Sequence, residues 1–288
     1  MSGTPENTGG GDPVPRISVV MPVYNAERLL DECLAALCAS RGVAYEILVV
    51  DDGSTDRSRA IAEAHGCRVI ASGGRLGPAG ARNRGAEQAR GDIIFFVDSD
   101  VVVRPDTLSR LISAFADALV DGVIAVQAPS MRLRNVCSRY KNLWMYYTYA
   151  RRVGEDVPLF YTTAAAIRRR AFLGAGGFDL NYANPNVEDT DFGQKLARLG
   201  YRIRVLPDLE VEHVKRYDLA GLLRTDFLRS MSLARLKLRK RADAIGNDTS
   251  VPTGYIVSVP LALAGALALV VGLAARLPVS CVAGVVAL

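Results

Sequence analysis

Residues 16–115 alternate between short apolar runs and longer stretches in which apolar residues recur every three or four positions. The apolar runs predict buried strands at residues 17–21, 46–50, 68–71 and 93–97. The stretches between them predict helices over residues 27–38, up to about residue 65, from the glycine-rich loop 73–80 to about residue 90, and over 105–115. Strands that alternate with helices favour an α/β fold with a parallel, doubly wound sheet.

The pattern is less regular after this point. Strands are predicted at residues 123–128, 160–168 and 201–206, and helices over 136–152, 189–200 and 219–241. The last helix has apolar residues at steps of three or four and many basic residues between them. This combination predicts an amphipathic helix that lies on a membrane surface.

Polar residues directly follow several of the predicted strands. Asp51 and Asp52 come after the second strand, and Asp98 and Asp100 come after the strand at 93–97. Ligands of doubly wound sheets bind beyond the carboxyl ends of the strands, so these groups are expected to share one site. Such a carboxylate pair suits a divalent cation that also holds phosphate oxygens, although an Asp-rich turn can simply cap the next helix.

The turn after the first strand argues against two common types of nucleotide site. A dinucleotide-binding enzyme would place G-x-G-x-x-G there, and a P-loop enzyme would carry a Walker sequence. Residues 22–25 instead read Pro-Val-Tyr-Asn, and neither motif is present. NAD chemistry and P-loop chemistry are therefore disfavoured.

Several short motifs, taken together and in order, resemble those of the family 2 glycosyltransferases of the GT-A fold. They occupy residues 19–25, 49–56, 80–85, 98–100, 176–179 and 188–189, followed by 195–201. The resemblance covers roughly residues 16–215 and implies a Rossmann-like, mostly parallel sheet. Processive members carry Q-x-x-R-W after the acidic motif. The corresponding stretch here, residues 224–229, has no such run, so a non-processive enzyme is expected.

The resemblance implies an inverting transfer of a sugar from a nucleoside diphosphate, with a role for each motif on the donor side. Asp52 is expected to accept a hydrogen bond from the base, and Arg82 to meet the diphosphate. The nucleoside pocket is expected to be lined by Pro22, Tyr24 and Asn25. Two alternatives are that Asn25 caps the first helix and that Arg82 forms a surface ion pair.

A metal site is also implied. Asp100 is expected to ligate Mg²⁺ or Mn²⁺ directly, and Asp98 to contact the metal or the ribose. His213 is a candidate third ligand, because related enzymes place a histidine near this point. The alternative is a structural role, which is common for an isolated histidine.

The acidic pair at Glu188 and Asp189 is expected to supply the catalytic base. The acceptor hydroxyl must lose a proton as it attacks the anomeric carbon, and a carboxylate can accept it. Asp189 is the first candidate and Glu188 the second, and their sequence does not decide between them. The alternative is that both residues lie in the first turn of a helix, where their negative charges interact favourably with the helix dipole, and this can hold whether or not they act in catalysis.

The end of the chain suggests a membrane anchor. Residues 255–275 carry no charge and are long enough to cross a bilayer, and a second apolar segment starts at residue 279. A buried hairpin of core helices is the alternative. Residues 215–241 hold nine Lys or Arg and two Asp, which predicts that this side faces the cytoplasm. Nucleic-acid binding is not expected, because no recognition motif accompanies the basic residues.

These observations divide the chain into four parts and predict its activity. A disordered tail (1–15) precedes the GT-A domain (16–215), a basic amphipathic segment at the membrane interface (216–250) and a transmembrane helix with the start of a second apolar segment (251–288). We expect a metal-dependent glycosyltransferase of the hexosyltransferase type at the cytoplasmic face of the cell membrane, with a nucleoside-diphosphate sugar as donor and a lipid-linked, glycolipid or polysaccharide acceptor. The alternatives are a nucleotide-sugar-binding protein without catalysis and a nucleotidyltransferase on a related fold.

Overall fold

The computed structural model describes residues 16–181, 187–239, 265 and 268. The chain divides into two units, residues 1–248 and 249–288, and all elements below belong to the first. The predicted tail (1–15) lies outside the described residues, as does the predicted membrane span apart from residues 265 and 268. Within the described part of the chain, no helix combines the length and the apolar character that crossing a membrane requires.

The core of the first unit is a mixed sheet whose strands follow the order β3-β2-β1-β4-β7-β6-β8-β5. The strands are β1 (Ile17–Val23), β2 (Tyr45–Asp51), β3 (Arg68–Ala71), β4 (Ile93–Val97), β5 (Val101–Val102), β6 (Gly122–Gln127), β7 (Ala164–Arg168) and β8 (Ile203–His213). Most neighbours run parallel, but β7 is antiparallel to both β4 and β6, and β5 is antiparallel to β8. The predicted α/β class with a mostly parallel sheet is confirmed.

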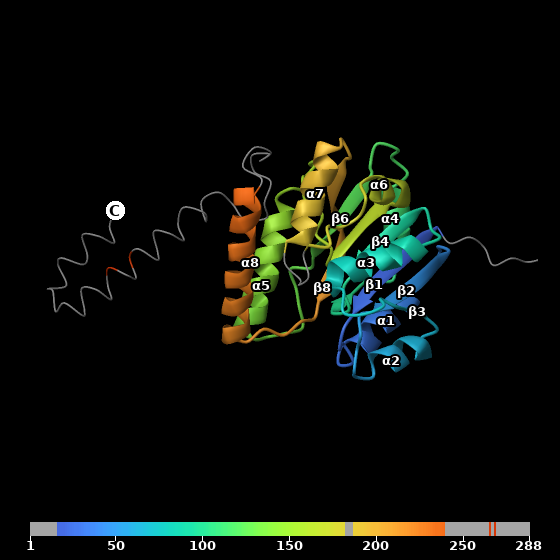
Figure 1. Cartoon of the computed structure of the whole chain (residues 1–288), viewed down its shortest axis with the longest axis horizontal. Coiled ribbons are helices and arrows are strands. Elements are labelled where there is room, and N and C mark those ends of the chain that lie inside the picture. The colour runs from blue at the N-terminus through green and yellow to red at the C-terminus, as the bar shows by residue number, and fades with distance from the viewer. Residues whose placement is uncertain (1–15, 182–186, 240–264, 266–267, 269–288) are drawn as a thin grey trace, which may run out of the picture. The chain divides into compact units, whose positions relative to one another are not determined.

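Helices cover both faces of the sheet (Figure 1). One face packs against α1 (Leu30–Cys38), α2 (Ser58–Ala64) and α4 (Thr107–Ala114). The other packs against α3 (Gly77–Gln88), α5 (Val136–Ala150), α6 (Arg169–Gly174) and α7 (Glu188–Arg198). The long helix α8 (Leu219–Arg239) lies beside α5 at the outer side of this layer (Figure 1).

The central strands are mostly apolar because both of their faces are covered. In β1, Val19 and Met21 face the core around α1 and α4, whereas Val20 faces the core around α3 and α5. Successive side chains of a strand point to opposite faces, so a strand buried on both sides must be apolar at every position. This is why the continuous apolar run 93–97 matches the central strand β4 in full. The run 68–71 also matches β3 in full, although β3 is a partly exposed edge strand.

The largest difference from the predicted elements concerns β8. The strand was expected to end at residue 206, before Pro207, but it continues to His213. Its pairing with β6 shifts register where Leu206 faces Ala125 and Glu210 faces Val126, so residues 207–209 form an irregularity that accommodates the proline. The two-residue strand β5 and the short helix α6 were not predicted, because each is too short to produce a periodic pattern.

Gly85 sets how closely α3 approaches the sheet. A Cβ atom at this position would lie 2.4 Å from Cγ1 of Val20 and 2.9 Å from Cγ2 of Val50. Both valines are fully buried in central strands and are stiff at χ1, so they cannot move aside. The absence of a side chain at residue 85 therefore allows α3 to carry its residues up to the edge of the sheet.

We predict that Gly85→Ala destabilises the protein. Helix propensity alone would favour alanine by up to about 1 kcal/mol, but the overpacking is expected to outweigh it and give a net loss of about 1–3 kcal/mol. Urea unfolding followed by circular dichroism measures the difference. Gly221→Ala is the matched control, because its added Cβ meets only the flexible side chain of Asp218. Equal stability of the two variants would contradict the close contact with the sheet.

Candidate active site

The topology brings the predicted functional residues to one edge of the sheet. β1, β2 and β4 are parallel to one another, and β6 is parallel to β8. Because β7 runs antiparallel to both β4 and β6, these two groups point in the same direction. The segments that follow β1, β2 and β4 and the end of β8 at His213 therefore meet at a common edge, as expected for the ligand site of such a sheet.

Asp52 holds the loop that leads into α3. Its two carboxylate oxygens accept hydrogen bonds from the backbone N–H groups of Leu76 (2.8 Å) and Gly77 (2.9 Å), and the residue is buried. A carboxylate at the start of a helix satisfies backbone donors that have no partner inside the helix. In this structure Asp52 therefore positions the glycine-rich loop, whereas its predicted contact with the base stays a prediction.

The same loop carries a residue that sequence analysis missed. The guanidinium of Arg75 lies over the ring of Tyr24, 4.0 Å from its centroid, and Tyr24 is 40% exposed. A cation over an aromatic ring is a favourable arrangement. Because Arg75 sits between glycines without any periodic pattern, its only sequence signal was its place in the glycine-rich loop. The structure thus joins the end of β1 to this loop through an accessible aromatic ring.

Asn25 ties the end of β1 to the turn after β2. Its backbone is left-handed, with φ of 49°, and its Oδ1 accepts a hydrogen bond from the N–H of Thr55 at 2.8 Å. The alternative that Asn25 caps the first helix is wrong: α1 begins at Leu30 and has no side-chain cap. Pro22, the third residue predicted for the nucleoside pocket, lies inside β1 opposite Val50.

Arg82 of α3 joins two carboxylates across the interior. Its Nη2 donates to Oδ1 of Asp98 at 2.8 Å, and its Nη1 donates to Oε1 of Glu188 at 3.1 Å. Burial alone would lower the pKa of Arg82, but the two carboxylates outweigh burial and raise it. Arg82 is only 4% exposed, so the alternative of a surface ion pair is wrong. The bridge fixes the end of β4 against the start of α7.

The two aspartates after β4 have separate partners. β4 ends at Val97, and the next residues form a turn closed by the N–H of Val101 and the carbonyl of Asp98 at 3.2 Å. Because they lie in a turn, their side chains do not follow the alternating directions of a strand. Asp98 contacts Arg82, whereas Asp100 lies near His213.

Asp100 and His213 are the pair that fits a metal ion. The pairing of β5 with β8 places Val101 opposite His213, and Nε2 of His213 lies 3.3 Å from Oδ1 of Asp100. The two atoms are not aligned for a hydrogen bond, so this buried oxygen has no donor. Burial opposes ionisation of Asp100, but His213 and Lys215 outweigh it and lower its pKa. An ionised oxygen without a donor, beside an imidazole, suits a divalent cation.

Among the described residues, Asp100 and His213 are not part of a larger group of metal ligands. Over residues 16–181 and 187–239, the structure contains no cluster of three or more His, Cys, Asp or Glu side chains that could hold a metal ion. Asp98, predicted as a further ligand, is occupied by Arg82, and burial raises its pKa despite that contact. The described residues therefore provide a two-residue site, and remaining ligands would have to come from substrate oxygens or water.

Glu188 and Asp189 form the first turn of α7 and are both buried. Glu188 pairs with Arg82, whereas Oδ1 of Asp189 accepts a hydrogen bond from the N–H of Thr190 and its Oδ2 lies 3.9 Å from Nη2 of Arg229. Burial raises the pKa of Asp189 to about 6, and Arg229 opposes part of this rise. A carboxylate with such a pKa can accept a proton near neutral pH, so the structure favours Asp189 over Glu188 as the candidate base.

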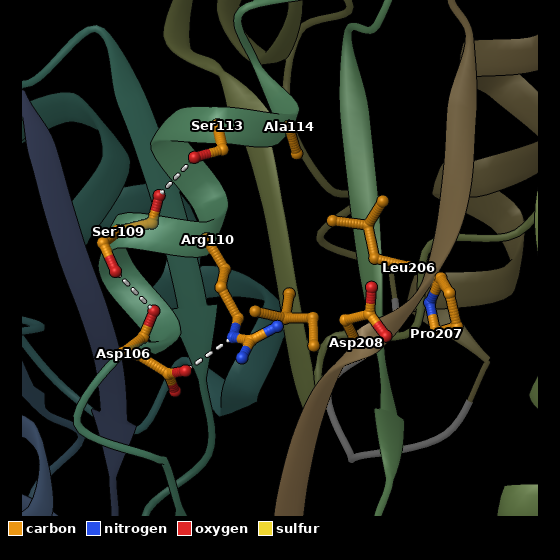
Figure 2. Close-up of a pocket in the computed structure, with 9 residues that line it drawn as sticks. Asp106, Ser109, Arg110, Ser113, Ala114, Leu206, Pro207 and Asp208 are labelled. Atoms are coloured by element: carbon orange, nitrogen blue, oxygen red, sulfur yellow. Dashed lines mark hydrogen bonds and ion pairs between the residues drawn. The ribbon is translucent and has the colours of Figure 1, made fainter.

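A separate pocket lies away from these residues. A groove lies between α4 and the irregularity of β8, and Figure 2 shows the residues that line it. Its volume is about 400 Å³. Its polar groups include Asp106, which accepts a hydrogen bond from Arg110 at 2.7 Å, and Asp208. None of the predicted site residues lines this groove, so it does not belong to the candidate active site.

We predict that Arg82→Met destabilises the protein strongly. The substitution leaves Asp98 and Glu188 without their shared cation, and breaking a buried pair in this way costs about 3–5 kcal/mol. Urea unfolding measures the loss. Arg84→Met is the control two residues along the same helix, because its ion pair with Glu87 is exposed and is worth at most about 1 kcal/mol. A similar loss of stability in both variants would show that the buried ion pairs of Arg82 contribute no more to stability than the exposed pair of Arg84.

Comparisons with known proteins agree with this arrangement. Residues 18–174 match the family described as Glycosyl transferase family 2. An undecaprenyl-phosphate 4-deoxy-4-formamido-L-arabinose transferase of Pseudomonas aeruginosa (strain LESB58) is 38% identical over 141 residues, 46% of this chain and 42% of the relative. An uncharacterized protein of Mycobacterium tuberculosis is 30% identical over 213 residues, 63% of this chain and 62% of the relative. The chain thus spans less than two thirds of the length of either relative.

Solved structures show the same fold. A mannosyltransferase from Pyrobaculum calidifontis in complex with GDP-Man and Mn²⁺ has a TM-score of 0.57 at 21% identity, with 87% of this chain and 80% of the other covered. TarS 1–349 from S. aureus in complex with UDP-GlcNAc has a TM-score of 0.57 at 25% identity, with 78% and 67% covered. The sheet is of the GT-A type found in these enzymes, and the chain belongs to glycosyl transferase family 2.

Proposed function

We propose that the protein is an inverting, metal-dependent glycosyltransferase at the cytoplasmic face of the cell membrane. It moves a sugar from a nucleoside-diphosphate sugar to an acceptor that is lipid-linked, a glycolipid or a polysaccharide. The observation that carries this proposal is the buried carboxylate of Asp189, whose pKa is raised to about 6, near the Arg82 bridge that also holds Asp98. The names of relatives that act on a lipid phosphate or bind GDP-Man and UDP-GlcNAc support it.

The donor would bind across the ends of β1, β2 and β4. The exposed ring of Tyr24, with Arg75 above it, offers a flat surface for the base. Asp100 and His213 would hold Mg²⁺ or Mn²⁺, and the bound ion would offset the negative charge that grows on the departing diphosphate. Arg82 keeps Asp98 in place and contributes positive charge near this region.

On the acceptor side, Asp189 takes the proton of the attacking hydroxyl. The hydroxyl oxygen attacks the anomeric carbon from the face opposite the diphosphate, so the configuration at that carbon inverts. A positioned carboxylate contributes about a hundredfold to ten-thousandfold to such a step. The name of the Pseudomonas aeruginosa relative gives a lipid-phosphate acceptor, whose oxygen is already ionised near neutral pH and needs no base. The role of Asp189 therefore implies a hydroxyl acceptor, which differs from the acceptor in that name. Glu188 supports Asp189 indirectly, because its pair with Arg82 anchors the first turn of α7.

The first test is a panel of UDP-, GDP- and dTDP-sugars added to the full chain with Mn²⁺. A donor present at a hundred times its dissociation constant should stabilise the protein by about 2.7 kcal/mol, which a thermal shift detects. Transfer should require Mg²⁺ or Mn²⁺ and release the nucleoside diphosphate. Asp100→Asn should abolish turnover, because the metal ion loses a ligand. Full activity of this variant would contradict the metal role, and release of pyrophosphate would indicate nucleotidyl transfer instead.

We also predict how activity depends on Asp189. Asp189→Asn should lower kcat about a hundredfold to ten-thousandfold while nucleotide binding persists, because the amide cannot accept the proton. A base works only when it is deprotonated, so kcat/KM of the unmodified enzyme should fall below about pH 6, tenfold per pH unit. Rate profiles with a hydroxyl acceptor measure both effects. Asp191→Asn, in the same turn of α7, is the control. Turnover that survives in Asp189→Asn would place the base elsewhere.

A further inference from the structure

Helix α8 has two different apolar faces. On its inner face Leu222, Leu233 and Leu236 are buried against the domain. On its outer face Leu219, Leu223 and Phe227, four residues apart, are 63%, 62% and 63% exposed, and Met231 continues the row. Large side chains in a continuous exposed row indicate a surface that binds something. We call these four residues the outer row of α8.

The neighbouring helix adds to this surface. The large side chains of α5 at 45% exposure or more also recur every three or four residues: Val136, Tyr140, Leu143 and Tyr147. The two helices lie side by side (Figure 1). An ion pair between Lys141 and Asp226 joins them. An accessible apolar surface is therefore distributed over two adjacent helices, of which sequence analysis had found only one.

The charges around the outer row favour an acidic bilayer as the partner. Arg216, Arg224 and Arg235 lie in the same segment as the outer row and are exposed. Of the two acidic residues of this segment, Asp226 is paired with Lys141 and Asp218 accepts a hydrogen bond from the N–H of Gly221. Apolar side chains flanked by arginine and lysine are typical of helices that lie in the headgroup layer. The uncharged run 255–275 follows in the sequence, which would keep α8 near the bilayer.

The inner face of α8 reaches the candidate base. Arg229, two residues from Phe227, places Nη2 3.9 Å from Oδ2 of Asp189, and the two side chains are 25% and 8% exposed. Arg229 is the charged group that α8 contributes to the surroundings of Asp189. The other groups that face Asp189 are Glu188 from α7, Arg82 from α3, Tyr149 from α5 and Tyr161 from the segment before β7.

We propose that α8 couples membrane binding to catalysis: the outer row enters an acidic bilayer, and the fixed helix then holds Arg229 against Asp189. Arg229 is thus a positioning residue that keeps the base ionised and oriented. Arg229 and the outer row lie on the same helix, so a displacement of the outer row moves Arg229 away from the carboxylate of Asp189. The inference rests on the proposed function, since it concerns the same base.

The test compares the full chain in nanodiscs of phosphatidylcholine alone and of phosphatidylcholine with phosphatidylglycerol. The unmodified enzyme should transfer sugar faster in the acidic discs. The outer-row variant Leu223→Gln/Phe227→Gln should lose this gain. In this variant the fall of kcat/KM on the acidic side of the pH profile, the acid limb, should shift to higher pH by at least about one unit. At a given pH on the acid limb, this shift lowers kcat/KM about tenfold. Leu228→Gln, an equally polar change at an exposed leucine on another side of α8, should behave like the unmodified enzyme.

A double-mutant cycle tests the coupling itself. Arg229→Met should cause the same shift of the acid limb, and adding the outer-row changes to it should cause no further loss. Losses that multiply, or an outer-row variant with unchanged rate and acid limb, would overturn the proposal. A rate gain that follows protein concentration rather than acidic lipid would assign the surface to a second copy of the chain, and would also overturn it.

A readout without activity separates this inference from the proposed function. In a Trp144→Phe background, which removes the native tryptophan of α5, the fluorescence of Phe227→Trp should be quenched by brominated phospholipid in acidic discs if the outer row enters the bilayer. Absence of quenching would overturn the inference even if sugar transfer is observed. Quenching without transfer from any nucleotide sugar would support the docking of α8 and contradict the proposed function.

Discussion

The guanidinium of Arg82 holds the candidate site together. It is buried between Asp98, which follows β4, and Glu188, which begins α7, and it arrives there on α3. Three elements distant in the sequence thus converge on one cation. Without a shared partner, two buried carboxylates would repel each other or take up protons, and the start of α7 would have no anchor at the edge of the sheet. The close packing of α3 at Gly85 allows this reach.

The bridge also divides the acidic residues between two tasks. Asp98 and Glu188 are occupied by Arg82 and serve mainly to hold the site in shape. Asp100 and Asp189 have no such strong partner, since the nearest side-chain nitrogen atoms, of His213 and Arg229, lie 3.3 Å and 3.9 Å away. Carboxylates that are buried but not neutralised are the ones able to bind a cation or take a proton. Because Arg82 pairs with Asp98 and Glu188, the carboxylates of Asp100 and Asp189 remain available at the edge of the sheet.

Much of the fold and a large part of the site could be predicted from the sequence. The central strand β4 is covered on both faces and apolar at every position, so it was found with its full bounds, and the motifs placed Asp100, Glu188 and Asp189 at strand and helix ends. The partners of these residues could not be predicted. Arg75 and Arg229 lie in stretches rich in basic residues or glycine, where no local pattern distinguishes a residue at the site from one in solvent.

The sequence by itself determined the alternation of strands and helices, the family and the set of polar residues at the sheet edge, because these depend on local periodicity and on short motifs. Only the tertiary structure decided that Asp52 holds backbone N–H groups, that Asp98 and Asp100 have different partners, and that α8 presents one apolar row outward and Arg229 inward. These features depend on contacts between residues that are distant in the chain. The direction of a side chain relative to another element is set by packing, which no single stretch of sequence records.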